Sequence, residues 1–241
     1  MAITIYWACN EKEWMRAKEP EPIYKNFAKI GKDKKTLIEF CPSIKNYMKN
    51  TFALKSLYDY NFEINDENNI KSNLYDQNFF DKHVIIRSSI DKLFSFNQEF
   101  VFFTEEKSLK MSAGITPFLE NNNITKRCIN IPGTLDIGKW FRLIDFAFYL
   151  KDDFNKFEIN EEEIFQYIKF ETDKKIIFKQ FTVNEKINKY FYDIINAKSF
   201  RINKPRTLDS YYLMFNHKKQ IIKEIKNNLI DEKLKDKNKK V

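Results

Sequence analysis

Residues on which most enzyme and metal sites depend are scarce in this sequence. Its 241 residues include four glycines, three cysteines and two histidines, His83 and His217. The sequence contains no Gly-rich phosphate loop, no Gly-x-Ser-x-Gly and no His-Glu-x-x-His. A site of two histidines and one carboxylate needs a His-x-Asp/Glu pair on one strand, whereas Val84 and Ile85 follow His83. We therefore expect no catalytic residues, no metal site and no cofactor, and a non-enzymatic role is favoured.

The cysteines are too few and too widely spaced for a disulfide framework. Cys9, Cys41 and Cys128 are odd in number and form no Cys-x-x-Cys pair, which indicates reduced thiols. Cys41 precedes Pro42 at an expected strand-to-helix junction, and a helix N-terminus lowers the pKa of a thiol. Cys41 is therefore the best candidate for a reactive thiol, although a buried structural cysteine is the more frequent case.

Long apolar runs are absent as well. No stretch approaches the roughly 18 apolar residues of a membrane-spanning helix, so we expect no membrane among the partners. The first residues, MAITIYWACNEKEW, lack the basic leader and the long apolar run of a signal peptide.

Arginine is the scarce basic residue, with six among the 42 lysines and arginines. The chain is rich in Lys, Asn, Ile, Phe and Tyr instead, which is typical of AT-rich coding sequence. Part of the net charge of +8 therefore reflects codon usage, and nucleic acid is not the expected primary partner. Nucleic-acid binding through the Lys-rich C-terminal segment stays an alternative.

Aromatic and β-branched residues, in contrast, are abundant, and 24 phenylalanines are enough for a large core. Strand-like patterns recur along most of the chain, and the segment 128–181 has the highest density of them. Strands are expected at 3–9, 36–41, 52–64 (one strand or two), 70–75, 84–86, 93–96, 99–104, 110–116, 128–131, 140–150, 157–159, 164–171 and 176–181. Trp140–Leu150 is the longest and is apolar on both faces, so we expect the C-terminal helices to cover it. The strands at 157–159 and 164–171 are expected to form a hairpin with a solvated acidic turn.

From Asn184 the apolar spacing changes to the period of a helix. One helix is expected there, and a second from Thr207 as N-cap to about Leu234. The predicted fold is α+β and mainly β: an antiparallel β-sandwich or jelly-roll-like core followed by two C-terminal helices. The predicted organisation is a β-sandwich domain over 1–182, a helical appendage packed on it over 183–234, and a basic tail over 235–241.

Arg142 is the one chemical oddity in the strand-rich segment. It lies between Phe141 and Leu143, and a buried guanidinium must be paired. Asp145 is three residues on and is expected on the opposite face, so the partner must come from another strand. One interpretation is a structural ion pair. The other places Arg127, Trp140 and Arg142 around an anionic or aromatic ligand or partner.

Four segments carry a resemblance: CPSIKNYMKNTFALKSLYDYNFEIND, KHVIIRS, FVFFTEEKSLKMSAG and IPGTLDIGKWFRLIDFAF. Together they resemble a protein family of T4-like marine phages of the cyanophage kind, over most of the chain. More weakly, the chain is similar to a domain-of-unknown-function family in which an aromatic strand precedes a β-hairpin. The resemblance implies a phage source, and hence the virion or the host cytoplasm, but no activity.

A local resemblance concerns KFEINEEEIFQYIKF, which is similar to the strand–turn–strand of jelly-roll and β-clip enzymes. Its turn lacks the glycine of those enzymes, so no catalytic residue is carried over. The function expected first is a virion-associated or host-interaction module with a phage or host protein partner, able to form homo-oligomers. The alternatives are an accessory phage enzyme, hydrolytic or nucleotide-directed, and the nucleic-acid-binding protein.

Overall fold

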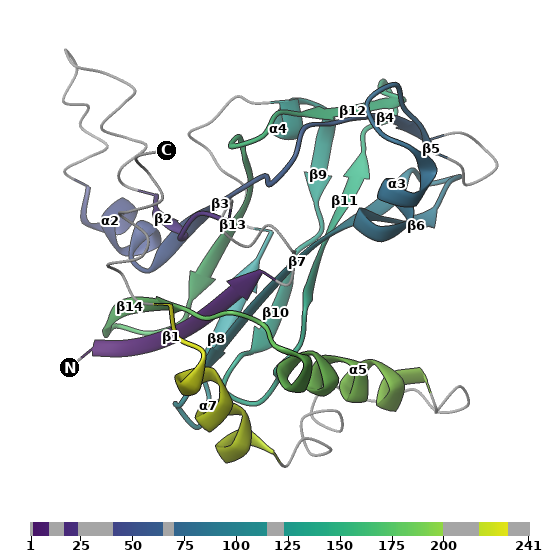
Figure 1. The fold of residues 1–241 in the computed structure, drawn as a ribbon. Coiled ribbons are helices and arrows are strands. Elements are labelled where there is room, and N and C mark those ends of the chain that lie inside the picture. The colour runs from purple at the N-terminus through teal and green to yellow at the C-terminus, as the bar shows by residue number, and fades with distance from the viewer. Residues whose placement is uncertain are drawn as a thin grey trace, which may run out of the picture.

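The computed structural model describes residues 2–9, 17–23, 41–64, 70–114, 123–199 and 217–230. Within these ranges the chain forms three β-sheets, with two of its helices near the C-terminus (Figure 1). The mainly β fold with C-terminal helices is thereby confirmed. None of the helices in these ranges combines the length and hydropathy needed to cross a membrane.

The described strands divide among the sheets as follows. Sheet A contains β1 (Ala2–Cys9), β6 (Val84–Ser88), β7 (Leu93–Thr104), β9 (Cys128–Asn130), β11 (Ile144–Leu150) and β14 (Lys175–Gln180). Sheet B contains β2 (Glu21–Pro22), β3 (Thr51–Lys55), β8 (Lys110–Ala113), β10 (Gly133–Asp136) and β13 (Ile164–Phe170). Sheet C contains β4 (Tyr60–Ile64), β5 (Ile70–Lys71) and β12 (Lys156–Ile159). The helices are α2 (Pro42–Met48), α3 (Gln77–His83), α4 (Asn123–Arg127), α5 (Glu185–Ser199) and α7 (Lys218–Asn227).

Sheet A is arranged around β7. One edge of β7 pairs with β11, and β9 lies beyond β11. The other edge pairs with β1 over residues 100–104 and with β6 over residues 93–96, so β1 and β6 lie end to end. β1 also pairs with β14, and this pair is parallel, whereas the other pairs described are antiparallel.

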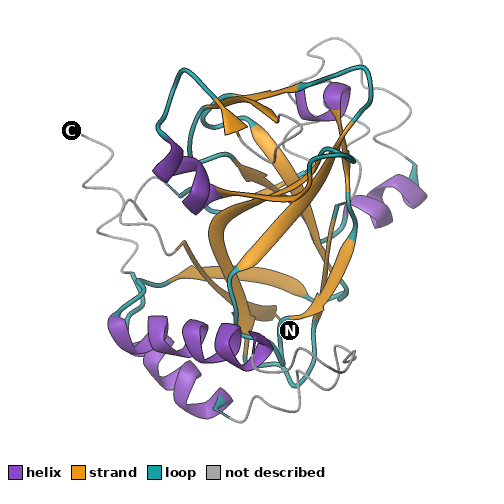
Figure 2. Cartoon of the chain, turned by 90° about the vertical axis from the view of Figure 1, so that its right-hand side faces the viewer, coloured by secondary structure: helices purple, strands orange, loops and turns teal. Residues whose placement is uncertain are grey.

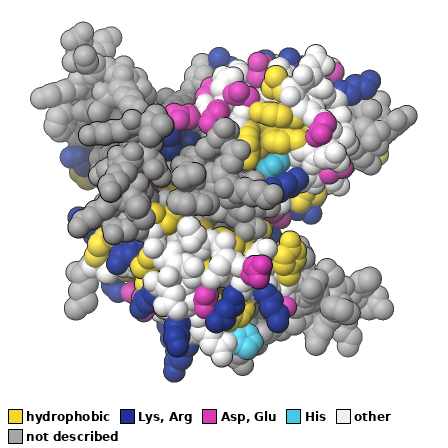
Figure 3. Space-filling view, viewed as in Figure 1, with side chains coloured by type: hydrophobic (Ala, Val, Ile, Leu, Met, Phe, Trp, Pro, Cys, Tyr) yellow, Lys and Arg dark blue, Asp and Glu magenta, His cyan; other side chains and the backbone are white. Residues whose placement is uncertain are grey.

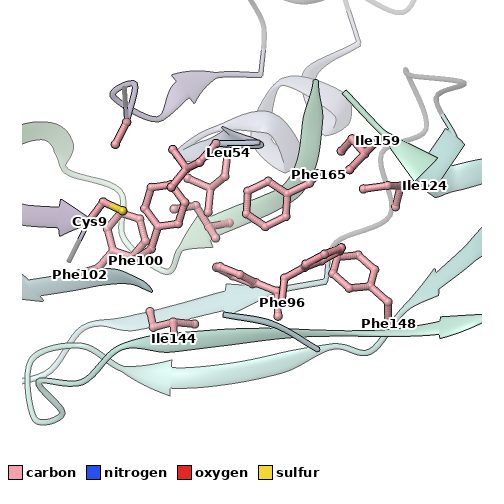
Figure 4. Close-up of a cluster of buried hydrophobic side chains, with 14 of the residues drawn as sticks. Cys9, Leu54, Phe96, Phe100, Phe102, Ile124, Ile144, Phe148, Ile159 and Phe165 are labelled. Carbon is pink, nitrogen blue, oxygen red and sulfur yellow. The ribbon is translucent and has the colours of Figure 1, made fainter. Parts of the chain in front are cut away.

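The main core lies between sheet A and sheets B and C. Phe96 of β7 and Phe148 of β11 point into it from one side, and Phe165 of β13 meets them from the other (Figure 4). The ring centroids of Phe146 and Phe165 are 5.4 Å apart, with the rings edge to face. A fully buried phenylalanine stabilises the fold by about 1.5–3 kcal/mol, so this core accounts for the abundance of phenylalanine in the chain.

A second core lies on the opposite surface of sheet A, against α5 and α7 at one end of the molecule (Figures 1 and 2). The sheet contributes Tyr6 and Ala8 of β1 and Val101 and Phe103 of β7. The other buried members are Phe141, Phe181, Ile187, Phe191, Ile221, Ile222 and Ile225.

Within sheet A, the strands covered on both surfaces are therefore β1 and the end of β7, and the prediction for Trp140–Leu150 is wrong. Residues 140–143 form no strand, because the N–H groups of Lys139 and Trp140 donate to the Asp136 carbonyl oxygen at 3.0 and 2.9 Å and turn the chain. In β11 burial alternates, and only one face is fully buried. β7, with 12 residues, is the longest described strand and joins two segments that were predicted separately.

Pairing differs from the prediction at the acidic turn. β12 pairs with β4, whereas β13 pairs with β3 and β8, so the two strands exist but do not form the expected hairpin. β10 and α4 were not predicted. Residues 36–40 of one expected strand and 207–216 of the expected second helix lie outside the described residues, and the domain boundary after residue 182 stays a prediction.

Candidate partner-binding face

Within the described ranges, helices cover one half of the outer surface of sheet A. α5 and α7 cover β1 and the end of β7, while β6, the start of β7, β11 and β9 keep accessible side chains on the same surface. Side chains alternate along each strand, and the pairing register places the outward side chains of these strands beside one another. We call this set the open face: Ile85, Arg87, Leu93, Ile129, Ile131, Asp145, Ala147 and Tyr149.

The middle of the open face is apolar. Ile129 pairs with Tyr149, which pairs in turn with Leu93, so three outward side chains form a row across β9, β11 and β7. Ile131 lies beside Ala147, because its N–H donates to the Ala147 carbonyl at 2.9 Å. Ile129 and Ile131 are 52% and 42% exposed, which is high for isoleucines on a sheet.

Two arginines share one carboxylate at one end of the open face. Nη2 of Arg142 lies 3.3 Å from Oδ2 of Asp145, and Nη2 of Arg87 lies 3.4 Å from the same oxygen. Nε of Arg142 donates to the Leu143 carbonyl at 2.7 Å, and its guanidinium lies 5.1 Å from the centroid of the Trp140 ring. Because two positive groups meet one negative group, this end keeps a positive charge.

The prediction for the ion-pair partner of Arg142 was wrong. Asp145 was expected on the opposite face, but residues 140–143 form a turn instead of a strand, and alternation does not apply across it. Of the three predicted site residues, Trp140 and Arg142 lie together, and Arg127 does not join them. Arg127 lies by the other end of β11, where it pairs with Glu158 at 3.5 Å and lies over the Phe154 ring. The sequence argument missed Arg87, although the scarcity of arginine singles it out equally.

Exposed carboxylates lie at the other end of the open face. The Tyr149 hydroxyl donates to Oδ1 of Asp152 at 3.0 Å, and this hydrogen bond, with the nearby negative charge, raises the pKa of Tyr149. Asp91 lies in the turn between β6 and β7 and accepts a hydrogen bond from the Ser88 hydroxyl at 2.8 Å. Ile90 in the same turn is 91% exposed.

The histidines do not lie together. His83 is 3% exposed and packs against the rings of Tyr58 and Phe79 at centroid distances of 5.1 and 4.4 Å. Hydrophobic side chains gather on the surface over this part of the molecule (Figure 3). His217 is exposed and hydrogen-bonds with Gln220. Among the described residues no group of three or more His, Cys, Asp or Glu side chains is placed to hold a metal ion.

The carboxylates in and beside the expected acidic turn make separate contacts. Glu158 pairs with Arg127, and Glu162 pairs with Lys18. Glu163 accepts a hydrogen bond from the Asn160 N–H at 2.7 Å. Glu162 and Glu163 belong to a solvated turn, as expected, whereas Glu158 lies in β12.

Cys41 is the N-cap of α2, as the sequence indicated. The backbone N–H groups of Ile44 and Ser43 at the start of the helix favour the thiolate and lower the pKa of Cys41. Cys9 and Cys128 are buried, and burial raises the pKa of Cys128 to about 12. The three thiols therefore differ in ionisation and access.

Asp136 is a buried carboxylate that the sequence argument missed. It ends β10, is 5% exposed, and accepts hydrogen bonds from the N–H groups of Leu109 and Gly138, each at 3.0 Å. The Ser108 hydroxyl donates at 2.5 Å, and Nζ of Lys139 lies 3.3 Å away. Burial alone would raise the pKa of Asp136, but these hydrogen bonds outweigh it and the pKa is lowered. The Asp-x-Gly spacing at a turn was the available signal.

Three lysines of α5 and α7 are engaged within the molecule. Nζ of Lys218 donates to the carbonyl oxygens of Glu106 and Gly138, and burial lowers the pKa of Lys218. Lys186 pairs with Glu224 at 2.8 Å. Lys226 pairs with Glu105 of the sheet at 2.9 Å. These contacts fasten the helices and reduce the positive charge offered to a polyanion.

Comparisons with known proteins complete the description of the chain. Neither the protein-family models, nor the curated proteins, nor the solved structures contained a match to it.

Proposed function

We propose that this chain is a non-enzymatic interaction module that binds a protein partner through the open face. The proposal rests on the difference between the two halves of the outer surface of sheet A. Where α5 and α7 pack, its apolar side chains form a core; on the other half, Ile129 and Ile131 keep about half of their surface accessible. Accessible apolar patches rimmed by polar groups are typical of protein-binding sites.

The border of the open face has the side chains that anchor protein interfaces. Trp140 and Arg142 are half buried and lie against each other, and Tyr149 stands in the apolar row. Tryptophan, tyrosine and arginine contribute most to binding energy when a partner excludes water from them. The shared pairing with Asp145 holds Arg142 in place before binding, which lowers the entropy lost on association.

The setting of this interaction is part of the proposal. Segments of the sequence resemble a family of T4-like marine phages, and this supports a phage or host protein as partner, in the particle or in the infected cell. Mass spectrometry of purified particles separates the two settings. A chain absent from particles would act inside the infected cell.

Site-specific photo-crosslinking tests the binding surface. A benzophenone amino acid at position 131 is expected to capture a partner protein, whereas the same group at position 177 is not. Ile177 is the matched control, because it lies on β14 of the same sheet and is also 42% exposed. The adduct at 131 should fall when Arg142 is replaced by Ala. Equal adducts at both positions, or none at 131, would contradict the proposal.

A further inference from the structure

We propose that the partner seated on the open face is the open face of a second copy of this chain. The inference rests on the proposed function, since it names the partner of the same surface. The two copies would be related by a two-fold axis that lies between the faces and crosses the strands at Ala147. A two-fold contact places one patch against itself, which requires a face whose two halves complement each other.

The apolar residues of the open face meet this requirement. Rotation about an axis across the strands at Ala147 places the Ile131 side chain of one copy against Ile131 of the other, because Ile131 lies beside Ala147. Ile129, which lies beside Tyr149 two residues further along the strands, flanks this contact in each copy. Ala147, the smallest outward side chain of β11, lies on the axis and allows the sheets to approach. Sheets packed face to face are separated by about 10 Å, a gap that isoleucine and tyrosine side chains fill.

The charged ends of the open face are complementary under the same rotation. Arg142 and Asp152 lie five residues from Ala147 in opposite directions, so Arg142 of each copy would face the exposed Asp152 of the other. Cations also lie near those carboxylates, but they are engaged elsewhere. Nζ of Lys92 donates to the backbone carbonyls of Asp152 and Phe154. Arg127 is held by Glu158 and Lys151 by the carbonyls of Thr125 and Lys126. These cations lower the net negative charge of this end, but Oδ2 of Asp152 remains available to Arg142 of the other copy.

The area of the open face determines how strongly the two copies are expected to bind each other. Four strands at about 4.8 Å spacing and about seven residues at 3.3 Å each give a footprint of roughly 440 Å² per copy. Such a contact is near the lower limit of specific interfaces. The dimer is therefore expected to be weak and to form over a micromolar concentration range.

Sedimentation velocity of the full chain, from about 1 to 200 µM, tests the inference. A concentration-dependent dimer is expected, and Ile131→Asp should weaken it at least tenfold. Ile177→Asp is the control, with the same exposure on another strand of sheet A, and should leave it unchanged. Thermal melting followed by circular dichroism establishes that each variant is folded.

A charge exchange supplies a test that does not depend on the apolar variant. Arg142→Glu and Asp152→Arg should each dissociate the dimer, because like charges then meet at both ends. An equimolar mixture of the two variants should associate again, because opposite charges then meet at both ends. A chain that stays monomeric at 200 µM, or variants that dimerise alone as well as mixed, would overturn the inference. A monomer that still gives the crosslink at position 131 would refute the second copy while retaining the proposed function.

Discussion

Replacing Asp136 by Ala is expected to destabilise the fold by about 3 kcal/mol. The change removes the acceptor for the N–H groups of Leu109 and Gly138 while leaving both in a buried turn. A buried donor left without a partner costs about 1–3 kcal/mol, so two such donors give roughly 2–6 kcal/mol. The change removes the side-chain link between the turn after β10 and the segment that follows β7, and leaves the backbone hydrogen bond from the Ile137 N–H to the Leu109 carbonyl.

Asp136→Asn is the comparison that isolates the charge. The remaining amide oxygen can still accept from Leu109 and Gly138, and the amide group can donate to the Ser108 hydroxyl. Only the contact with Lys139 is lost, and that lysine is 43% exposed. The expected cost is about 1 kcal/mol, and Lys139→Ala should cost less still, as exposed ion pairs usually do.

Urea unfolding, followed by the fluorescence of the buried Trp7 and by circular dichroism, measures these differences. The pH dependence of the free energy of unfolding gives a further test, because the carboxylate of Asp136 can be protonated at low pH, whereas the amide of the Asn variant cannot. The folded pKa of Asp136 is lowered, so its contribution is present above the unfolded pKa of about 3.9 and disappears as pH falls through the folded value. The difference between the native chain and Asp136→Asn should therefore shrink below about pH 4. An Ala variant within about 0.5 kcal/mol of the native chain, or no less stable than the Asn variant, would refute the reasoning.

Three further outcomes are expected. Gly114→Ala should destabilise by at least about 1–2 kcal/mol in urea unfolding, because φ is +86° and a Cβ would lie 2.7 Å from a Pro132 backbone atom. Gly133→Ala, with nothing within 4 Å, should change stability by less than about 0.5 kcal/mol, and equal losses would contradict the argument. Iodoacetamide at pH 8 should alkylate Cys41 before Cys128 in peptide mapping of the native chain; simultaneous labelling would show that burial does not protect Cys128. Ile221→Ala should cost about 2–5 kcal/mol by thermal or urea unfolding, since Ile221 is fully buried between α7 and sheet A, and a neutral effect would show that the helix is not anchored there.

Patterns of apolar residues predicted the existence of strands better than their partners. The alternation over residues 52–64 indicated one strand or two, and the chain forms β3 and β4. These strands enter different sheets, because the chain turns between them and the Ser56 N–H donates to the Glu163 carbonyl. Periodicity reports which face of a strand is buried, whereas pairing depends on residues distant in the sequence. The parallel pairing of β1 with β14 could not be predicted for the same reason.

The candidate site was predicted in part for a similar reason. Scarcity of arginine pointed to Arg142, and its guanidinium lies over the ring of Trp140, while a binding role for the two residues stays a prediction. Asp145 was assigned to the wrong face because the turn anchored on the Asp136 carbonyl ends the alternation before β11. Ile129 and Ile131 gave no signal, since an isoleucine in a strand predicts burial and only the described helices show which half of the surface is covered.

The position of β1 has a consequence for the synthesis of the chain. β1 pairs with β7 on one side and β14 on the other, and Ala2 lies opposite Lys175. A ribosome adds about 5–20 residues per second, so this strand is made many seconds before its parallel neighbour and the helix that covers Tyr6. During that interval one edge of β1 lacks the strand with which it pairs in the finished sheet. Its aromatic side chains also lack their final cover. Folding is therefore expected to be slow and completed late, with the nascent chain most prone to aggregation before residues 175–225 emerge.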